Sequence, residues 1–306
     1  MTNPGWGGAA NEGTPPQPRC VRHPDRPTAL SCNRCGRPAC PECLREAAVG
    51  YQCVDCVAAG QRDVRQVRNV AGAVTTQQRA VPLVTYILMA ANVGIFLITA
   101  AQSRSIMQNQ AGSTLFADWA LFPPAVVDGQ LVRVIGSGFL HFGLIHLAVN
   151  MFALWIIGRD TELVLGRARY ACVYFASILG GSAAVMLFQL HAVTAGASGA
   201  VFGLMGAQAV ILLRLRRSPA PVISVIAINV IISITIPGIS LWGHLGGLVA
   251  GAAATAAILY GPQLLGAGNN REKAVTVGWI CLGAVVLVPL AVIAVRTLQL
   301  RASFGY

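Results

Sequence analysis

Residues 80 to 297 form a succession of seven apolar runs separated by polar segments, and few folds can accommodate such a chain. The runs cover residues 80–101, 144–158, 168–190, 198–213, 221–236, 242–260 and 274–297. With 55% hydrophobic and only 11% charged residues, a chain of 306 residues is too apolar to be a soluble domain. Because backbone groups inside lipid must be hydrogen-bonded within the protein, each run is predicted to be a transmembrane helix. We therefore expect an all-α polytopic membrane protein.

The loops between the runs differ in their number of basic residues, and this difference predicts the orientation of the chain. The loops after the second, fourth and sixth runs hold eight basic residues, whereas the opposite loops hold two. The eight are Arg159, Arg167, Arg169, Arg214, Arg216, Arg217, Arg271 and Lys273, and the two are Arg104 and Arg133. Basic loops stay in the cytoplasm, so the amino terminus is expected there, in a multi-pass protein of the plasma membrane. The net charge of +11 has the same explanation, because no aromatic-interleaved basic stripe suggests nucleic-acid binding.

A short polar segment, residues 20–56, holds seven of the nine cysteines in pairs with two residues between the partners. The pairs are Cys20 and His23, Cys32 and Cys35, Cys40 and Cys43, and Cys53 and Cys56. This spacing lets both side chains of a pair face one ion, so eight ligands predict two tetrahedral Zn²⁺ sites. Disulfides would need an oxidising compartment and would leave one cysteine and the histidine unexplained. A segment with so small a core is expected to depend on its metal for folding and to bind proteins or regulate.

The remaining segments complete the predicted domain organisation. Residues 1–19, rich in glycine and proline, are expected to be a disordered tail. Residues 57–79 carry four arginines and are expected to be a basic linker beside the membrane. No cleavable apolar segment precedes residue 80, so no signal peptide is expected. The membrane core is placed at residues 80–260, and residues 261–306 supply a loop, a seventh transmembrane helix and a short tail.

Two motifs place reactive side chains at the start of apolar runs. The segment 196–199, Gly-Ala-Ser-Gly, leads into the fourth run, and His244 opens the sixth. Gly247 and Gly251 share a helical face with His244, and small residues at this spacing let two membrane helices approach closely. A serine on one helix and an imidazole on the other can then hydrogen-bond. The sequence therefore predicts a buried pair formed by Ser198 and His244.

A third motif places His146 and Asn150 one helical turn apart at the start of the second run. Polar side chains inside lipid are costly, so we expect this pair to donate hydrogen bonds to an oxyanion. The alternative is a polar pair that braces the helix bundle.

Glu162 lies about 24 Å of helix beyond His146, which is too far to complete a catalytic triad. A Ser–His dyad is therefore expected.

Taken together, the motifs resemble those of the rhomboid family of intramembrane serine proteases, in the same order and each at the head of a span. The matching segments are Gly-x-Ser-Gly at 196–199, His-x-x-x-Asn at 146–150 and Gly-His-x-x-Gly-x-x-x-Gly at 243–251. The resemblance covers roughly residues 80–260 and implies a six-helix rhomboid core. It implies that Ser198 is the nucleophile and His244 the general base and acid. His146, Asn150 and the Ser198 backbone N–H would form the oxyanion hole.

Three further features bear on the resemblance. The family often has a Trp-Arg pair before the second span, and here Val132 and Arg133 occupy the corresponding place, so the pair is half kept. Gly158 and Glu162 fit a Gly-x-x-x-Glu pattern that implies a structural hydrogen-bonding site at the far end of this span. Residues 20–56 resemble a B-box-type zinc finger, whose ligand pairs interleave. That resemblance implies one ion held by Cys20, His23, Cys40 and Cys43 and another held by Cys32, Cys35, Cys53 and Cys56. The spacing alone also allows sequential pairing.

The function expected from these features is that of an intramembrane serine endopeptidase. It would cut transmembrane segments of single-span or polytopic membrane proteins near the outer face, and it would need no cofactor for catalysis. The zinc domain would bind a cytosolic protein. The alternative is a non-catalytic rhomboid-like scaffold or receptor whose zinc domain recruits cytosolic partners. A transporter is disfavoured, because no inverted repeat is evident.

Overall fold

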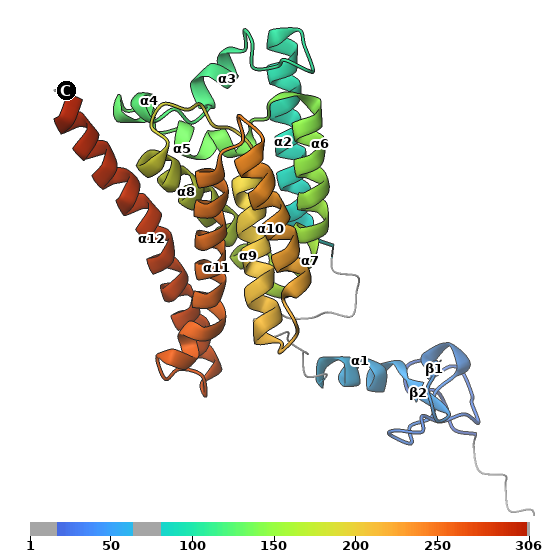
Figure 1. The fold of residues 1–306 in the computed structure, drawn as a ribbon. Coiled ribbons are helices and arrows are strands. Elements are labelled where there is room, and N and C mark those ends of the chain that lie inside the picture. The colour runs from blue at the N-terminus through green and yellow to red at the C-terminus, as the bar shows by residue number, and fades with distance from the viewer. Residues whose placement is uncertain (1–16, 64–80, 305–306) are drawn as a thin grey trace, which may run out of the picture. The chain divides into compact units, whose positions relative to one another are not determined.

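A computed structural model describes residues 17–63 and 81–304 of the chain, which belong to two compact units (Figure 1). The first unit comprises Met1–Gln66 and the second comprises Val67–Tyr306. Most of the predicted tail, residues 1–16, and most of the predicted linker, residues 64–79, lie outside the described residues.

The first unit is built around a short antiparallel hairpin. Strand β1 (Leu44–Glu46) pairs with β2 (Tyr51–Cys53), with Leu44 opposite Cys53. Helix α1 (Val54–Asp63) follows directly, so the beginning of the predicted linker is helical. The buried core consists of six cysteines together with Ala39 and Leu44. All the cysteines carry free thiols, which argues against the disulfide alternative.

The second unit is a bundle of helices, and each of the seven predicted apolar runs is helical. They are α2 (Leu83–Ser103), α6 (Gly143–Ala153), α8 (Arg167–Phe188), α9 (Ser198–Arg214), α10 (Ala220–Thr235), α11 (Leu241–Leu264) and α12 (Arg271–Phe304). Four of them, α2, α8, α11 and α12, are long and apolar enough to cross a membrane unaided. Helices α9 and α10 are apolar but shorter, with 17 and 16 residues. The fold is thus that of an all-α membrane protein, as predicted.

The second predicted span is longer than expected. A π-helical turn, η3 (Leu154–Gly158), joins α6 to α7 (Arg159–Leu165), and helical structure continues through the charged segment that was expected to end the span. The reason is that Glu162 faces inward. Its carboxylate accepts hydrogen bonds from the backbone N–H groups of Val84 and Thr85 and from the Thr85 hydroxyl, at 2.8–3.0 Å. These N–H groups belong to the first turn of α2, where helical partners are missing. The structural role expected of Glu162 is confirmed.

Glycines bring α8, α9 and α11 into backbone contact. A Cβ on Gly247 would collide with the carbonyl oxygen of Gly199, and a Cβ on Gly251 would collide with that of Gly203. On the other side of α11, a Cβ on Gly246 would collide with the Gly180 carbonyl oxygen of α8. The close approach predicted for the fourth and sixth runs is therefore present, and α8 joins it.

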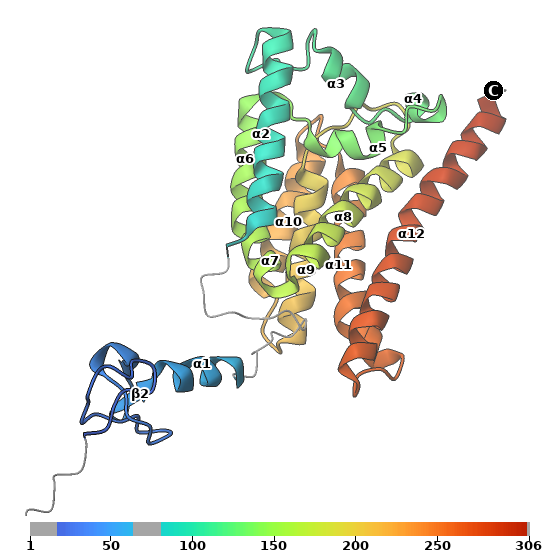
Figure 2. The same ribbon diagram turned by 180° about the vertical axis from the view of Figure 1, so that it is seen from behind.

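The seventh transmembrane helix, α12, packs against the core rather than standing apart (Figure 2). It contacts α11 and α8, and two of its arginines donate to backbone carbonyls of other elements. Arg296 donates to Met186 of α8 at 3.3 Å, and Arg301 donates at 2.6 Å to Val127, the last residue of α4 (Pro123–Val127).

The loop between α2 and α6 is folded into short helices. Besides α4 it contains α3 (Thr114–Trp119), α5 (Arg133–Gly136) and the 3-10 turn η2 (Ser137–Phe139). The buried guanidinium of Arg133 donates to the carbonyl oxygens of Ala117 and Ala120 at 2.6 and 2.7 Å. It also donates to the side chain of Gln130. Arg133 therefore fastens the end of α3 to α5.

Candidate active site and metal centres

Ser198 is the first residue of α9, and the segment before it is fixed by the long loop. Leu121 and Thr194 exchange two backbone hydrogen bonds of 2.9 Å, and Gly196 N–H donates to the carbonyl oxygen of Ser137 in η2 at 2.9 Å. The first N–H groups of a helix have no helical partner and carry the positive end of its dipole. The Ser198 hydroxyl thus lies where developing negative charge is favoured.

Gly196 is required at its position for two reasons. Its φ of +140° lies in a region that L side chains rarely adopt. A Cβ there would also lie 2.8 Å from Cε1 of His146 and 3.4 Å from the Ser198 hydroxyl oxygen. Gly196 therefore leaves open the space that the His146 ring and the Ser198 hydroxyl share on one side of the backbone.

The partner of Ser198 is His244, which lies in the first turn of α11. His244 Nε2 lies 2.8 Å from the Ser198 Oγ, which is hydrogen-bonding distance. The Ser240 side chain caps α11 by accepting from Gly243 N–H at 3.1 Å, so the helix begins just before the histidine. The backbone contact of α9 with α11 sets the separation of the two side chains.

Two residues that the sequence did not indicate hold the His244 ring. The ring stacks on Phe202, with centroids 4.2 Å apart and planes 11° from parallel. Its other nitrogen, Nδ1, lies 2.7 Å from the hydroxyl oxygen of Ser233 on α10. Phe202 stands four residues after Ser198, so both lie on one face of α9. The plane of the imidazole and both of its nitrogens are therefore constrained.

His146 approaches the same place from α6. Its Nδ1 lies 3.2 Å from the backbone N–H of Phe142 and accepts a hydrogen bond from it. A neutral imidazole carries one proton, so this bond leaves the proton on Nε2. The would-be Cβ of Gly196 lies 3.0 Å from that Nε2, which places the donor on the side of Ser198. His146 has the form needed to donate to an oxyanion.

Asn150 and two further histidines occupy other places. Asn150 is buried one turn from His146, and its amide donates to the His146 carbonyl oxygen at 2.9 Å. His141 is fully buried and packs edge-on against His146, with ring centroids 5.2 Å apart. His191 is exposed, as a loop residue should be. The structure thus brings Ser198, His244 and His146 together, with Asn150 next to His146.

The first unit contains two clusters whose ligand atoms lie within 4.8 Å of one another. One is formed by Cys20, His23, Cys40 and Cys43, and the other by Cys32, Cys35, Cys53 and Cys56. This grouping is the interleaved one. In the first cluster, His23 Nδ1 lies 3.4 Å from each of two sulfurs and 3.9 Å from the third. In the second, the sulfurs of Cys35 and Cys53 are 3.8 Å apart. Both clusters can hold metal ions.

The clusters also favour thiolates at some positions. Hydrogen bonds from the backbone of Cys40 and of Cys53 lower the pKa of Cys20 and of Cys32, respectively, to about 6. Burial raises the pKa of Cys43 to about 11, and the side chain of Cys35 raises the pKa of Cys56 to about 12. A cation would stabilise all these sulfurs in the thiolate form, which is the form that binds metals.

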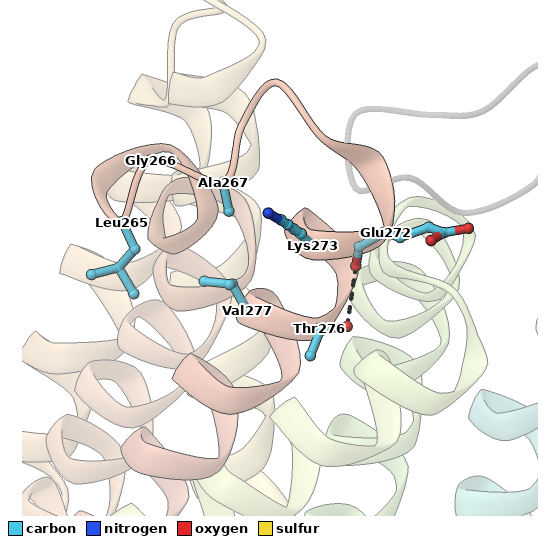
Figure 3. Close-up of a pocket in the computed structure, with 7 residues that line it drawn as sticks. All are labelled: Leu265, Gly266, Ala267, Glu272, Lys273, Thr276 and Val277. Atoms are coloured by element: carbon cyan, nitrogen blue, oxygen red, sulfur yellow. Dashed lines mark hydrogen bonds between the residues drawn. The ribbon is translucent and has the colours of Figure 1, made fainter.

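A surface pocket lies at the turn between α11 and α12, lined by residues that include Leu265, Glu272 and Lys273 (Figure 3). Helix α11 separates it from His244 by about 30 Å, at 1.5 Å per residue over the twenty residues to Leu264. This pocket is therefore remote from the serine and the two histidines and takes no part in their chemistry.

Comparison with known proteins identifies the family of the second unit. A rhomboid domain matches residues 128–261, which contain all three motifs. The chain is 32% identical to the rhomboid protease GluP of Bacillus subtilis over 70% of this chain and 40% of that protein. It is 36% identical to RHOMBOID-like protein 6, mitochondrial, of Arabidopsis thaliana over 50% of this chain and 52% of the relative. It is also 30% identical to rhomboid-like protease 3 of Toxoplasma gondii, over 53% of this chain and 64% of that protein.

The chain thus spans between two fifths and two thirds of the length of these relatives. The matched residues 128–261 include the heads of α6, α9 and α11, where the motifs lie. On these grounds the chain belongs to the rhomboid family.

Proposed function

We propose that the protein is an intramembrane serine endopeptidase in which Ser198 and His244 form the catalytic dyad. The observation that carries this proposal is the 2.8 Å separation of His244 Nε2 and Ser198 Oγ at the start of α9. Two of the relatives are named as proteases, which supports the same reaction type. The substrate would be a peptide bond in a transmembrane segment of another membrane protein.

The reaction follows from the roles open to each group. His244 Nε2 takes the proton of the Ser198 hydroxyl as its oxygen attacks the scissile carbonyl carbon. The oxyanion that forms is stabilised by the Ser198 backbone N–H and by His146 Nε2–H, with Asn150 as a further donor. His244 then gives its proton to the leaving amine, and the peptide C–N bond breaks. Water hydrolyses the acyl-enzyme by the same steps, regenerating Ser198 and releasing the carboxylate product.

The short length of α9 supports a site recessed from the membrane surface. Its 17 residues span about 25 Å, which is less than the roughly 30 Å of a bilayer's hydrocarbon core. If its basic end at Arg214 lies at the cytoplasmic surface, Ser198 lies within the outer half of the membrane. The charge difference between the loops supports this orientation in the plasma membrane, with the first unit in the cytoplasm.

We also propose that both clusters of the first unit bind Zn²⁺ as structural ions. Tetrahedral Zn²⁺ with Zn–S bonds of about 2.3 Å places two sulfurs about 3.8 Å apart. The separation of the Cys35 and Cys53 sulfurs is 3.8 Å, so this cluster fits that geometry. Four protein ligands per site leave no open position, which suits a structural role. The unit would then serve to bind a cytosolic protein.

The experiment that tests the protease assignment compares wild type, Ser198→Ala and His244→Ala as purified full-length proteins in liposomes. Each is given a membrane-helix substrate with a fluorescent tag, and separately a fluorophosphonate probe that labels activated serines. Wild type should cut the substrate and be labelled, whereas both variants should do neither. Equal cleavage by all three proteins would exclude the dyad. A wild type that neither cuts nor is labelled would favour a non-catalytic rhomboid-like scaffold.

A further inference from the structure

We infer that Ser233 is a positioning residue for His244, so that Ser198, His244 and Ser233 form one hydrogen-bonded relay across three helices. This inference rests on the proposed protease function and assigns a role to a residue of α10 that is outside the three motifs. Ser233 Oγ lies 2.7 Å from His244 Nδ1, and His244 Nε2 lies 2.8 Å from Ser198 Oγ.

The position of Ser233 in α10 is unusual for that helix. Helix α10 runs from Ala220 to Thr235, and all its residues are described. Ser233 is the only buried residue among them, with 5% of its surface exposed. A helix of such apolar composition would be expected to bury an aliphatic side chain most deeply. The most buried point of α10 is instead a hydroxyl in contact with His244.

The hydrogen bonds of Ser233 determine the direction of the relay. The Ser233 hydroxyl has a single proton, and its oxygen lies 2.7 Å from the carbonyl oxygen of Asn229, which can only accept. If that proton is donated to Asn229, the oxygen of Ser233 accepts from Nδ1–H of His244. The proton of neutral His244 is then on Nδ1, and Nε2 has a free lone pair facing the Ser198 hydroxyl.

If Ser233 instead donated its proton to His244 Nδ1, fewer hydrogen-bonding groups would be satisfied. Ser233 would have to turn its proton from Asn229 to Nδ1, and His244 would then donate from Nε2 to Ser198. An imidazole protonated at Nε2 cannot take the proton of Ser198, so this tautomer would be inactive as a base. Ser233 thus selects the tautomer that general-base catalysis requires.

The relay stays intact when His244 takes up a proton. The imidazolium donates from both nitrogens, and Ser233 still accepts from Nδ1–H. Phe202 holds the plane of the ring, so Ser233 has only to fix its rotation within that plane. Because Ser233 is neutral, it orients the ring without supplying the charge that a carboxylate would supply.

The test measures cleavage by wild type, Ser233→Ala and Ser233→Thr. Ser233→Ala should lower kcat about 10-fold, the effect of losing one hydrogen bond to a buried group, with KM unchanged. Ser233→Thr keeps a hydroxyl and should recover most of the loss. Ser224→Ala removes an exposed hydroxyl from the same helix and should behave as wild type. Equal kcat values for Ser233→Ala and wild type would overturn the inference.

A second measurement does not depend on activity. Nitrogen NMR of protein labelled at its five histidines reports which ring nitrogen carries the proton, and His244→Asn identifies the His244 signals. His244 should be protonated at Nδ1 in wild type and should populate both tautomers in Ser233→Ala. Protonation at Nε2 in wild type would contradict the role of Ser233. This result stands apart from the dyad test, because an inactive protein still reveals the tautomer.

Discussion

Substitution of His146 can distinguish its proposed role, as a hydrogen-bond donor to the oxyanion, from that of His244 as a base. Its Nδ1 accepts from Phe142, so its Nε2–H can donate but its ring cannot accept the Ser198 proton. Loss of one oxyanion donor typically lowers kcat by about 10²–10³-fold. His146→Ala should therefore lower kcat by about this factor in the liposome cleavage assay and leave KM nearly unchanged.

The matched control for His146→Ala is His191→Ala, which removes an exposed histidine in a loop. It should leave both kinetic constants unchanged. A His146→Ala protein that retains wild-type kcat would show that His146 only braces the bundle, which is the alternative its sequence motif left open.

At this scale, the sequence motifs indicated the polar residues that the structure brings together, but not Ser233 and Phe202, which contact the His244 ring. The sequence motifs place three polar residues at the heads of apolar runs, where polar side chains are rare and usually functional: Ser198, His244 and His146. Ser233 was overlooked because serine is common in membrane helices and usually bonds to its own backbone, as Ser233 also does with Asn229. Phe202 was overlooked because aromatic residues are ordinary packing residues in any apolar run.

Among the helices, α9 and α11 are in backbone contact beside the proposed dyad, and Gly247 is the best position at which to test this contact. A Cβ at this position would collide with the carbonyl oxygen of Gly199, which is backbone and cannot rotate away. Gly247→Ala should push the helices apart, at a cost of about 1–3 kcal/mol in unfolding free energy. A displacement of about 1 Å can reduce catalysis about 100-fold. Thermal unfolding in detergent and the cleavage assay measure the two effects.

Gly94→Ala on α2 is the control for this substitution, because a Cβ there would meet no atom within 4 Å. It should preserve activity and thermal stability. If Gly247→Ala were as active and stable as wild type, the backbone contact could not be what sets the separation of Ser198 and His244.

Element positions were predictable where hydrophobicity alone decides them. All seven apolar runs are helices, because lipid leaves the backbone no other partner. The helix of the second run extends beyond its predicted end. The charges at 159–162 indicated a membrane boundary, but the Glu162 side chain is turned inward and accepts hydrogen bonds from α2, so the helix continues through them. The short helices of the first long loop depend on tertiary contacts, such as those of Arg133, so no local sequence pattern predicts them.

Considered as a whole, the molecule combines two units that are stabilised by different means. The second unit has an extensive apolar core shared by its helices. The first has a core made mainly of cysteine sulfurs, which is too small to fold on apolar burial alone. The spacing of its ligands predicted that these side chains form clusters able to hold metal ions. It could not decide between interleaved and sequential pairing, because both use the same four pairs and differ only in how the chain folds back.

Paired substitutions distinguish the two pairings by metal content. In the interleaved arrangement Cys20 and Cys40 share a site, so Cys20→Ser with Cys40→Ser should empty one site and leave one ion per chain. Cys20→Ser with Cys32→Ser should remove a ligand from each site and release both ions. Sequential pairing predicts the reverse, because Cys20 and Cys32 would then share an ion.

Elemental analysis of purified full-length protein gives zinc per chain, with two ions expected for wild type. Cys172→Ser, which changes a cysteine of α8, is the control and should retain both ions. One retained ion in the Cys20 and Cys32 variant, with none in the Cys20 and Cys40 variant, would contradict the interleaved arrangement.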